Sequence, residues 1–134
     1  MNYWLLKTEP STFSWNDLAR DKQAVWDGVR NFQARKNLKG MKKGDLAFIY
    51  HTGDEKAIVG ISSVVKEAYP EPKEPTWAAV DLKAEKPLKN PVTLARIRLE
   101  RALQKMVLVR VSRLSVQPVT KEEYERILQL SIKP

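Results

Sequence analysis

Hydrophobic residues gather in short runs along the chain, and these runs predict strands. They cover residues 3–7, 24–26, 46–50, 57–66, 77–84, 107–111 and 114–116. The run at 57–66 is rich in β-branched residues, which favour strands, and Gly60 inside it predicts a bulge. The spacing between the runs is too irregular for repeated βαβ units. We therefore expect an α+β fold, a small mixed β-barrel of five or six strands with short flanking helices.

Polar capping residues mark where the helices should begin. Two segments have capping-box spacing, in which a Ser or Thr precedes an acidic residue by three positions. Asparagine and threonine are also good caps on their own, because the side-chain oxygen accepts a free backbone N–H of the first turn. The predicted helices begin at Ser14, Asn31, Thr93 and Thr120, and the second of them ends near Gly40.

The segment 69–75 is expected to be an exposed loop. It contains Pro70, Pro72 and Pro75, and each proline lacks a backbone N–H and has a fixed φ. Loops of this kind lie on the surface and are available for binding. Trp77, at the edge of the loop, therefore has room to take part in a binding site.

The charge balance points to a polyanionic partner. The formal net charge is +8 and the isoelectric point is about 9.8, which favours nucleic acid, although basic proteins without such a partner are common. The length fits a single domain over residues 1–134. The longest apolar run, 46–50, is far shorter than the ~18 residues that a membrane span needs. With no secretory leader pattern in the first residues, we expect a cytoplasmic protein without membrane contact.

Catalytic and metal-binding signals are weak. The chain has no cysteine and a single histidine, His51, so neither thiolate ligands nor a histidine pair can hold a metal, and we expect no metal and no cofactor. The sequence shows no nucleophile elbow, P-loop or dinucleotide fingerprint. A structural or hydrogen-bonding role is favoured for His51. Asp27 could act as a base or nucleophile, but no paired acid accompanies it.

Residues 26–35 combine aromatic, cationic and amide side chains beside a predicted turn at 27–28. Trp26 should lie at a strand end, close in the chain to Arg30, Asn31 and Gln33. Amide side chains offer a donor and an acceptor that match a base edge, and aromatic faces stack on bases. The alternative is structural, with Trp26 in the core and Asn31 as a helix cap.

The four tryptophans divide into two groups by their surroundings. Trp4 lies in a predicted strand and Trp15 in a predicted helix, so both are expected in the core. Trp26 and Trp77 lie beside a turn and a loop, where a pocket could use them.

At these residues the chain resembles the EVE domain family. The resemblance is carried in order by residues 4–10, 26–35, 48–52, 64–70, 77–81 and 113–118, which span nearly the whole chain. The family is similar in fold to PUA and YTH domains, small β-barrels with flanking helices. The resemblance implies binding of nucleic acid that carries a modified base, either modified cytosine in DNA or a modified RNA base, in an aromatic cage and without catalysis.

The resemblance also implies roles for individual residues. Trp26 and Trp77 are similar to cage walls. The remaining base-pocket residues are implied to lie at the pocket edge or in a further pocket segment, and they are Lys7, Thr8, Glu9, Asn31, Gln33, Tyr50, His51 and Thr52. Thr52 stands where the family usually has serine, and its extra methyl group is expected to narrow the pocket.

Two cationic segments are candidates for phosphate contacts. The first comprises Arg30, Arg35, Lys36, Lys39, Lys42 and Lys43, and the second comprises Arg96, Arg98, Arg101 and Lys105. The alternative for either segment is a solvated helix face that serves only solubility. A steep fall of affinity with salt is expected if they contact phosphates.

Two other classes of function remain open from the sequence. One is a small hydrolase or nucleoside-processing enzyme that uses Asp27 and His51. The other is a protein-interaction module that uses the loop at 70–75. Turnover of an oligonucleotide would favour the enzyme, whereas stoichiometric retention would favour a base-binding module.

Overall fold

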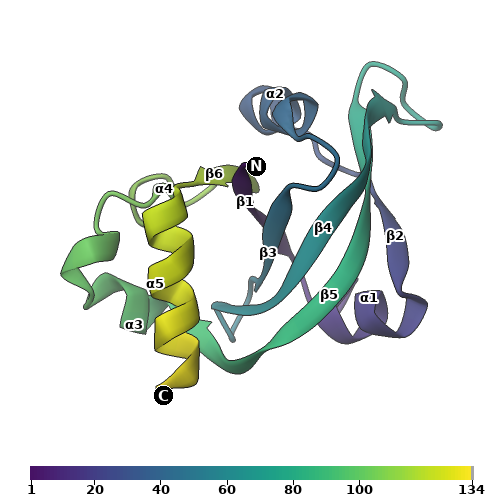
Figure 1. The fold of residues 1–134 in the computed structure, drawn as a ribbon. Helices are drawn as coiled ribbons and strands as arrows, with labels where there is room; N and C mark the ends of the chain where they lie inside the picture. Colours follow the sequence, from purple (N-terminus) through teal and green to yellow (C-terminus); the bar gives the residue numbers. More distant parts are fainter. Residues whose placement is uncertain (134) are drawn as a thin grey trace.

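The computed structural model describes residues 1–133, which form six strands and five helices (Figure 1). The strands are β1 (Tyr3–Thr8), β2 (Gln23–Trp26), β3 (Leu46–His51), β4 (Ala57–Pro70), β5 (Ala78–Thr93) and β6 (Val116–Val119). The helices are α1 (Trp15–Asp21), α2 (Phe32–Gly40), α3 (Leu94–Arg98), α4 (Val107–Arg110) and α5 (Lys121–Ile132), with a 3-10 turn η1 (Arg101–Leu103).

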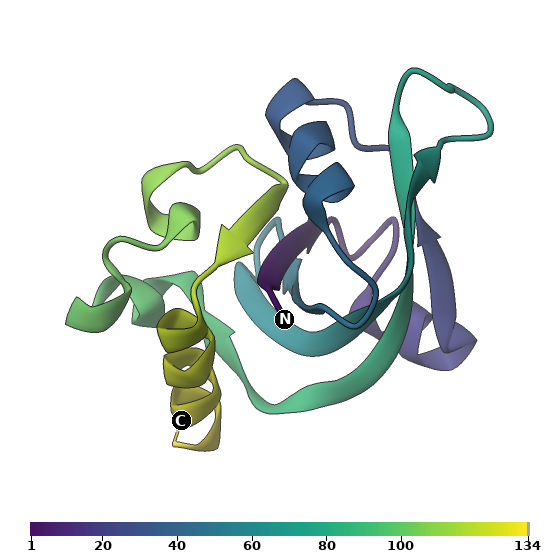
Figure 2. The same cartoon turned by 45° about the horizontal axis from the view of Figure 1, so that its top comes forward.

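All six strands belong to one strongly curved sheet (Figures 1 and 2). The strand order is β2-β5-β4-β3-β1-β6. β1 and β3 run parallel, and every other neighbouring pair is antiparallel. The predicted α+β class, with six strands in a mixed sheet, is confirmed. β2 and β6 are the two edges and do not pair with each other, so the curved sheet is open along one side.

Helix α2 bridges the two sides of this opening. It contacts β6 at one edge and β4 and β5 on the opposite side. Its buried residues are Ala34 and Leu38, and the side-chain amide of Asn37 donates a 2.7 Å hydrogen bond to the carbonyl oxygen of Val116. This hydrogen bond attaches α2 to the edge strand β6, beside the opening.

The predicted helix starts are confirmed by their caps. The Ser14 side chain accepts from the backbone N–H of Asp17, and the Asp17 carboxylate accepts from the backbone N–H of Ser14. Thr120 opens α5 with the same reciprocal pair. Asn31 and Thr93 cap α2 and α3 with single side-chain bonds. These caps satisfy backbone donors that would otherwise be free at the first turn of each helix.

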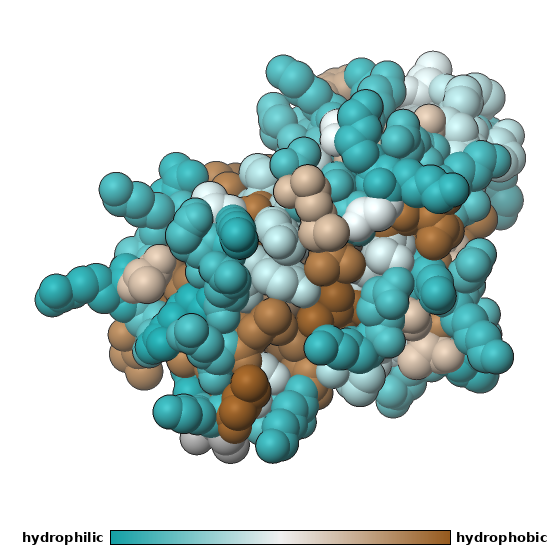
Figure 3. Space-filling view, in the orientation of Figure 1, coloured by the Kyte–Doolittle hydropathy of each residue, from teal (hydrophilic) through white to brown (hydrophobic). Residues whose placement is uncertain are grey.

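Two hydrophobic clusters lie on opposite faces of the sheet. The alternation of side chains along β1 sends Trp4 and Leu6 into one cluster and Leu5 into the other. Helices α1 and α2 contribute to the first cluster, and α3, α4 and α5 to the second. Trp4 and Trp15 are buried, as predicted. On the face in Figure 3, hydrophilic residues cover most of the surface, and a hydrophobic band crosses its middle.

The run 107–111 is not a strand, and this prediction was wrong. Residues 107–110 form the one-turn helix α4, in which Leu108 is buried, and the exposed Val111 follows it. The segment before it is already turning, and Leu103, Met106 and Leu108 all enter the second cluster. The spacing of these buried residues suits a helical turn, and their burial overrides the preference of valine for strands.

Strand boundaries near the prolines also differ from the prediction. β4 runs on to Pro70, where Tyr69 pairs with Ala79 and Pro70 with Ala78, so only residues 71–77 form the loop. At the end of a strand, the missing N–H of proline does not remove a hydrogen bond from between the strands. β5 continues to Thr93 instead of ending near residue 84, with shifts of register against β4. The last strand begins at Val116 instead of at residue 114.

No helix within residues 1–133 has both the length and the apolar character that crossing a bilayer requires.

Gly60 lies at the predicted irregularity of β4 and faces the Trp15 ring. The register against β5 shifts between Ile58 and Gly60. A methyl group at position 60 would lie 2.5 Å from ring carbons of Trp15. Glycine is therefore required here because the indole packs directly on the backbone.

Replacing Gly60 with alanine should destabilise the fold. Overpacking against the Trp15 ring is expected to lower the free energy of unfolding by about 1–3 kcal/mol. Gly40→Ala is the control, because its methyl group would lie at an ordinary 3.5 Å from Trp4. Urea unfolding of both variants measures the difference, and equal stabilities would contradict the tight packing.

Candidate functional site

A pocket of about 500 Å³ opens beside the edge strand β2. Residues 7–9 at the end of β1, residues 12–13 in the following loop, residues 25–30 at the end of β2 and Ser115 before β6 line it. The edge strand β2 bounds the pocket on one side, and the end of β1 with the residue before the edge strand β6 bounds it on the other. The pocket therefore occupies part of the opening that the unpaired edges leave.

The loop between β1 and α1 is compact, and this places Phe13 at the pocket. The backbone N–H groups of Thr12 and Phe13 both donate to the carbonyl oxygen of Glu9, each over 2.9 Å. The Thr8 hydroxyl donates to the carbonyl oxygen of Phe13 over 2.6 Å. These three bonds tie both ends of the loop together, so the phenyl ring has a defined place in the pocket wall.

Phe13 and Trp26 form an aromatic corner in the pocket. Their ring centroids are 6.0 Å apart and the ring planes meet at 78°. Trp26 is only 8% exposed and belongs to the first hydrophobic cluster, yet it also lines the pocket. A planar ligand can stack on one ring and meet the edge of the other, because the two walls are nearly perpendicular.

Charged groups of both signs surround the aromatic corner. Lys7 and Arg30 contribute donors, and Glu9 and Asp27 contribute carboxylate acceptors. Lys7 is half-buried, and burial lowers the pKa of its ammonium group. The pocket can therefore accept and donate hydrogen bonds along the edge of one planar, polar molecule.

A buried carboxylate fixes the wall that contains Trp26. Glu71 is 3% exposed and accepts two hydrogen bonds from the Arg30 guanidinium, at 2.7 and 2.8 Å. It also accepts the backbone N–H of Gly28 over 3.1 Å. Gly28 has φ +78°, a conformation that favours glycine. Hydrogen bonding from Arg30 lowers the pKa of Glu71 to about 2.

The predicted base-pocket residues separate into two groups. Lys7, Thr8, Glu9 and Trp26 line the pocket together. The others are placed elsewhere. Asn31 caps α2 through Oδ1, and Gln33 is exposed and donates to Asn37. Trp77, Tyr50, His51 and Thr52 do not line it either.

Trp77 belongs to a separate aromatic stack on the surface, so it and Trp26 do not face one slot. Its ring lies 5.4 Å from that of Phe32 with a 20° angle between planes. The guanidinium carbon of Arg35 lies 5.0 Å from the Phe32 ring and 5.2 Å from the Trp77 ring. Phe32 is 69% exposed. Of the two tryptophans expected to form a cage, Trp26 lines the 500 Å³ pocket together with Phe13, and Trp77 lines a different pocket of about 260 Å³.

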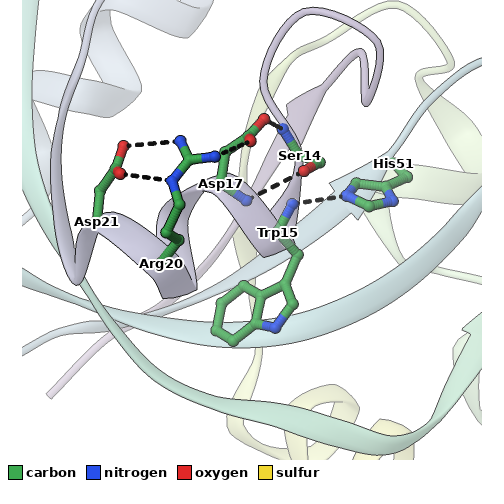
Figure 4. Close-up of polar contacts among 6 residues, drawn as sticks. All are labelled: Ser14, Trp15, Asp17, Arg20, Asp21 and His51. Atoms are coloured by element: carbon green, nitrogen blue, oxygen red, sulfur yellow. Dashed lines mark hydrogen bonds and ion pairs between the residues drawn. The ribbon is translucent and has the colours of Figure 1, made fainter.

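His51 is a structural residue that connects β3 to α1 (Figure 4). Its Nε2 accepts the backbone N–H of Trp15 over 2.9 Å, which places the ring proton on Nδ1, and Nδ1 lies 2.7 Å from a Glu55 carboxylate oxygen. Both ring nitrogens therefore have partners. This arrangement matches the structural role predicted for His51, and it leaves neither nitrogen free to act with Asp27.

Tyr50 and Thr52 line a second pocket, which shares Lys7 with the first. Its volume is about 250 Å³. The Lys7 ammonium donates to the carbonyl oxygen of Ser112 over 2.6 Å and lies 5.7 Å from the Tyr50 ring centroid. The sequence-predicted segment 50–52 thus borders a neighbouring cavity instead of the aromatic corner.

The predicted phosphate-binding residues differ in how free they are. Arg30 is held by Glu71, and Arg35 donates to the carbonyl oxygen of Thr76 over 2.8 Å. In the second segment Arg96 donates to the carbonyl oxygen of Leu130 over 3.0 Å. The cations that are exposed and whose side chains make no hydrogen bond or ion pair within residues 1–133 are Lys36, Lys39, Lys42 and Lys43 of the first segment and Arg98, Arg101 and Lys105 of the second.

Sequence reasoning missed Phe13, Thr12, Ser115 and Glu71. Phe13 directly precedes the capping residue Ser14, a position where a hydrophobic residue usually packs on its own helix, so the local pattern favours a structural role. Glu71 lies among prolines with no local partner, because Arg30 is 41 residues away in the chain. Within residues 1–133, no three His, Asp or Glu side chains gather as a metal site would require.

Comparisons with known proteins give consistent relatives. The EVE domain family model matches residues 2–130. Mouse thymocyte nuclear protein 1 is 38% identical over 165 residues, covering 96% of this chain and 73% of that protein. A structure from Rhodopseudomonas palustris has a TM-score of 0.93 at 44% identity, covering 98% of this chain and 93% of that one. Human THYN1 protein, solved in complex with 5-methylcytosine-containing DNA, has a TM-score of 0.93 at 35% identity, covering 100% and 99%.

The Glu71–Arg30 pair should make stability depend on pH in the acid range. The folded-state pKa of Glu71, about 2, is below its ordinary value of 4.5. Its contribution is therefore complete above pH 4.5 and is lost as the pH falls towards 2. Thermal unfolding at several pH values should show Glu71→Gln less stable than the parent at neutral pH, with a gap that narrows through this window. A gap that does not change with pH would contradict the role of the ion pair.

Proposed function

Because the chain belongs to the EVE domain family, we propose that it binds DNA carrying a modified base and holds that base at the Phe13–Trp26 corner without chemical change. The base proposed is a modified cytosine such as 5-methylcytosine. The complex of human THYN1 protein with 5-methylcytosine-containing DNA supports this choice. The observation that carries the proposal is an open pocket in which two aromatic rings meet charged groups of both signs.

The polar groups of the pocket suit the hydrogen-bonding edge of cytosine. Cytosine offers an amino donor, and Glu and Asp side chains accept from that group in protein–DNA complexes. Glu9 and Asp27 supply such carboxylates, and Lys7 supplies a donor for the base acceptors. Arg30 is already engaged by Glu71, so its role is to position the wall that contains Trp26.

Energetics limit how selective this recognition can be. Extruding a base from a duplex costs a few kcal/mol, less from a mismatch or a single strand. Stacking on an aromatic ring returns about 1–3 kcal/mol for each base. One methyl group in an apolar pocket adds about 1–3 kcal/mol, which corresponds to a preference of roughly 10–200-fold. We therefore propose moderate discrimination between methylated and plain cytosine.

The surface stack of Phe32 and Trp77 fits this function as an outer contact. Phe32 begins α2, directly after the segment 25–30 that lines the pocket, and Arg35 lies over both rings. Exposed aromatic rings beside arginine are typical of surfaces on which unpaired bases stack. The stack therefore extends the proposed binding surface beyond the pocket itself.

Blocking the pocket should remove selectivity while the fold remains intact. Trp26→Ala is a poor test, because Trp26 is part of the core and its loss is expected to cost about 3–5 kcal/mol. Thr12→Trp fills the pocket from an exposed loop position instead. Fluorescence anisotropy with methylated and plain duplexes should show the preference falling to near one in this variant.

Thr12→Ser is the matched control and should keep the preference of the parent protein. The oligonucleotides should be recovered unchanged by mass spectrometry after incubation. Retained selectivity in Thr12→Trp would place the methyl-reading contact elsewhere, and modified product would favour an enzyme instead.

Exposed lysines of the first cationic segment should contribute to salt-dependent affinity. Removing one cation that binds a phosphate is expected to reduce the slope of log affinity against log salt by about 0.7–0.9. The double variant Lys36→Gln/Lys39→Gln tests this against Lys83→Gln/Lys86→Gln on β5, where both lysines are also exposed. Identical slopes for the two double variants would assign these charges to solubility alone.

A further inference from the structure

We propose that the second pocket, beside the aromatic corner, is a subsite for a backbone phosphate of the bound nucleic acid, held by Lys7, Lys56 and Arg98. This inference rests on the proposed function, because it assigns a neighbour to the base in the first pocket. It concerns residues outside the aromatic corner, apart from Lys7, which lines both cavities.

Three cations converge on this pocket from three separate elements. Lys7 comes from β1, Lys56 from the turn before β4, and Arg98 from the end of α3. Ser112, Thr52 and Tyr50 also line the cavity, and none of its lining residues is acidic. Side chains from distant parts of the sequence therefore meet only because of the fold, unlike neighbouring charges on one helix face.

The positive charges have no counter-ion in the described part of the chain. Among residues 1–133, the ion pairs do not include Lys7, Lys56 or Arg98. Like charges that meet in a partly enclosed site repel one another, and a bound anion relieves this repulsion. Lys7 gives one hydrogen bond to Ser112 and has further donors available, because an ammonium group has three.

The backbone of Lys56 is strained at this place. Its φ is +47°, a left-handed conformation that is uncommon for lysine. Asparagine or glycine would adopt it more readily in a tight turn. Such strain is often found at ligand-binding positions, where the side chain serves another purpose than folding. The strained lysine thus agrees with a binding role for its ammonium group.

Tyr50 adds a neutral donor to the cationic wall. Burial raises the pKa of its hydroxyl group, although the nearby Arg98 opposes this. The phenol therefore keeps its proton at neutral pH and can donate to an anion. A tetrahedral anion with several acceptor oxygens matches this set of donors, as phosphate does in other protein sites.

The position of the pocket selects the nucleic-acid backbone as the source of the phosphate. The cavity adjoins the pocket of the aromatic corner, since Lys7 borders both. A nucleotide held at the corner carries phosphates on either side of its sugar. The same donors would also bind the phosphate of a free phosphorylated metabolite, and a titration with inorganic phosphate distinguishes this source from the nucleic-acid backbone.

The test uses Lys56→Asn and Arg98→Gln in the full chain with a duplex that contains one 5-methylcytosine. Asparagine removes the charge but tolerates the left-handed backbone. We expect each variant to lose several-fold in affinity and about 0.7–0.9 in salt slope. The preference for the methylated duplex should stay as in the parent, and the melting temperature of Lys56→Asn should not fall. Lys89→Gln, an exposed lysine on β5, controls for the loss of one charge.

The control variant and a phosphate titration define the results that would overturn the subsite. An equal loss in Lys89→Gln, or no loss in either pocket variant, would overturn the subsite. A second experiment titrates the protein with inorganic phosphate and follows the binding by NMR. Saturable chemical-shift changes at Lys56 and Arg98, together with an unchanged DNA affinity of the two variants, would assign the pocket to a small phosphorylated molecule. That result would overturn the role in binding the nucleic-acid backbone. A failure of the proposed function has a different signature, because Thr12→Trp would then retain the methyl preference or the parent would bind no DNA.

Discussion

The buried carboxylate of Glu71 holds the recognition wall in place. It joins the turn after β2 to the loop between β4 and β5 through the Gly28 amide and the Arg30 guanidinium. Glu71 is buried whereas the Arg30 side chain remains 43% exposed. Removing one partner of such a pair costs more than the pair itself contributes, because a charge is left without compensation. The orientation of Trp26 at the pocket thus depends on an acid that lies outside the pocket.

Local signals in the sequence were sufficient for most elements of the fold. Caps at Ser14, Asn31, Thr93 and Thr120 act within one turn, so the sequence predicts them directly. The error at residues 107–111 has a non-local cause, since burial in the second hydrophobic cluster decides that segment. Strand ends at prolines were also missed, because pairing partners determine where a strand can stop.

The site was predicted only in part, for the same reason. Lys7, Thr8 and Glu9 follow one another in the chain, and the resemblance groups them with Trp26, beside which they line the pocket. Phe13 was missed because its neighbours indicate a helix start. The resemblance groups Trp77 with Trp26, whereas the structure stacks it on Phe32, a contact that no local pattern shows. Contacts between distant segments, rather than residue types, distinguish a pocket wall from a surface stack.

Trp26 serves the interior and the pocket at once, and this restricts how the domain can be re-engineered. Any replacement that reshapes the ligand surface at this position also removes volume from the hydrophobic cluster. Replacements at positions 12 and 115 do not remove volume from this cluster, because Thr12 is exposed and Ser115 is half-buried. A library that aims to change the preferred base should therefore vary these two sites and leave the indole untouched.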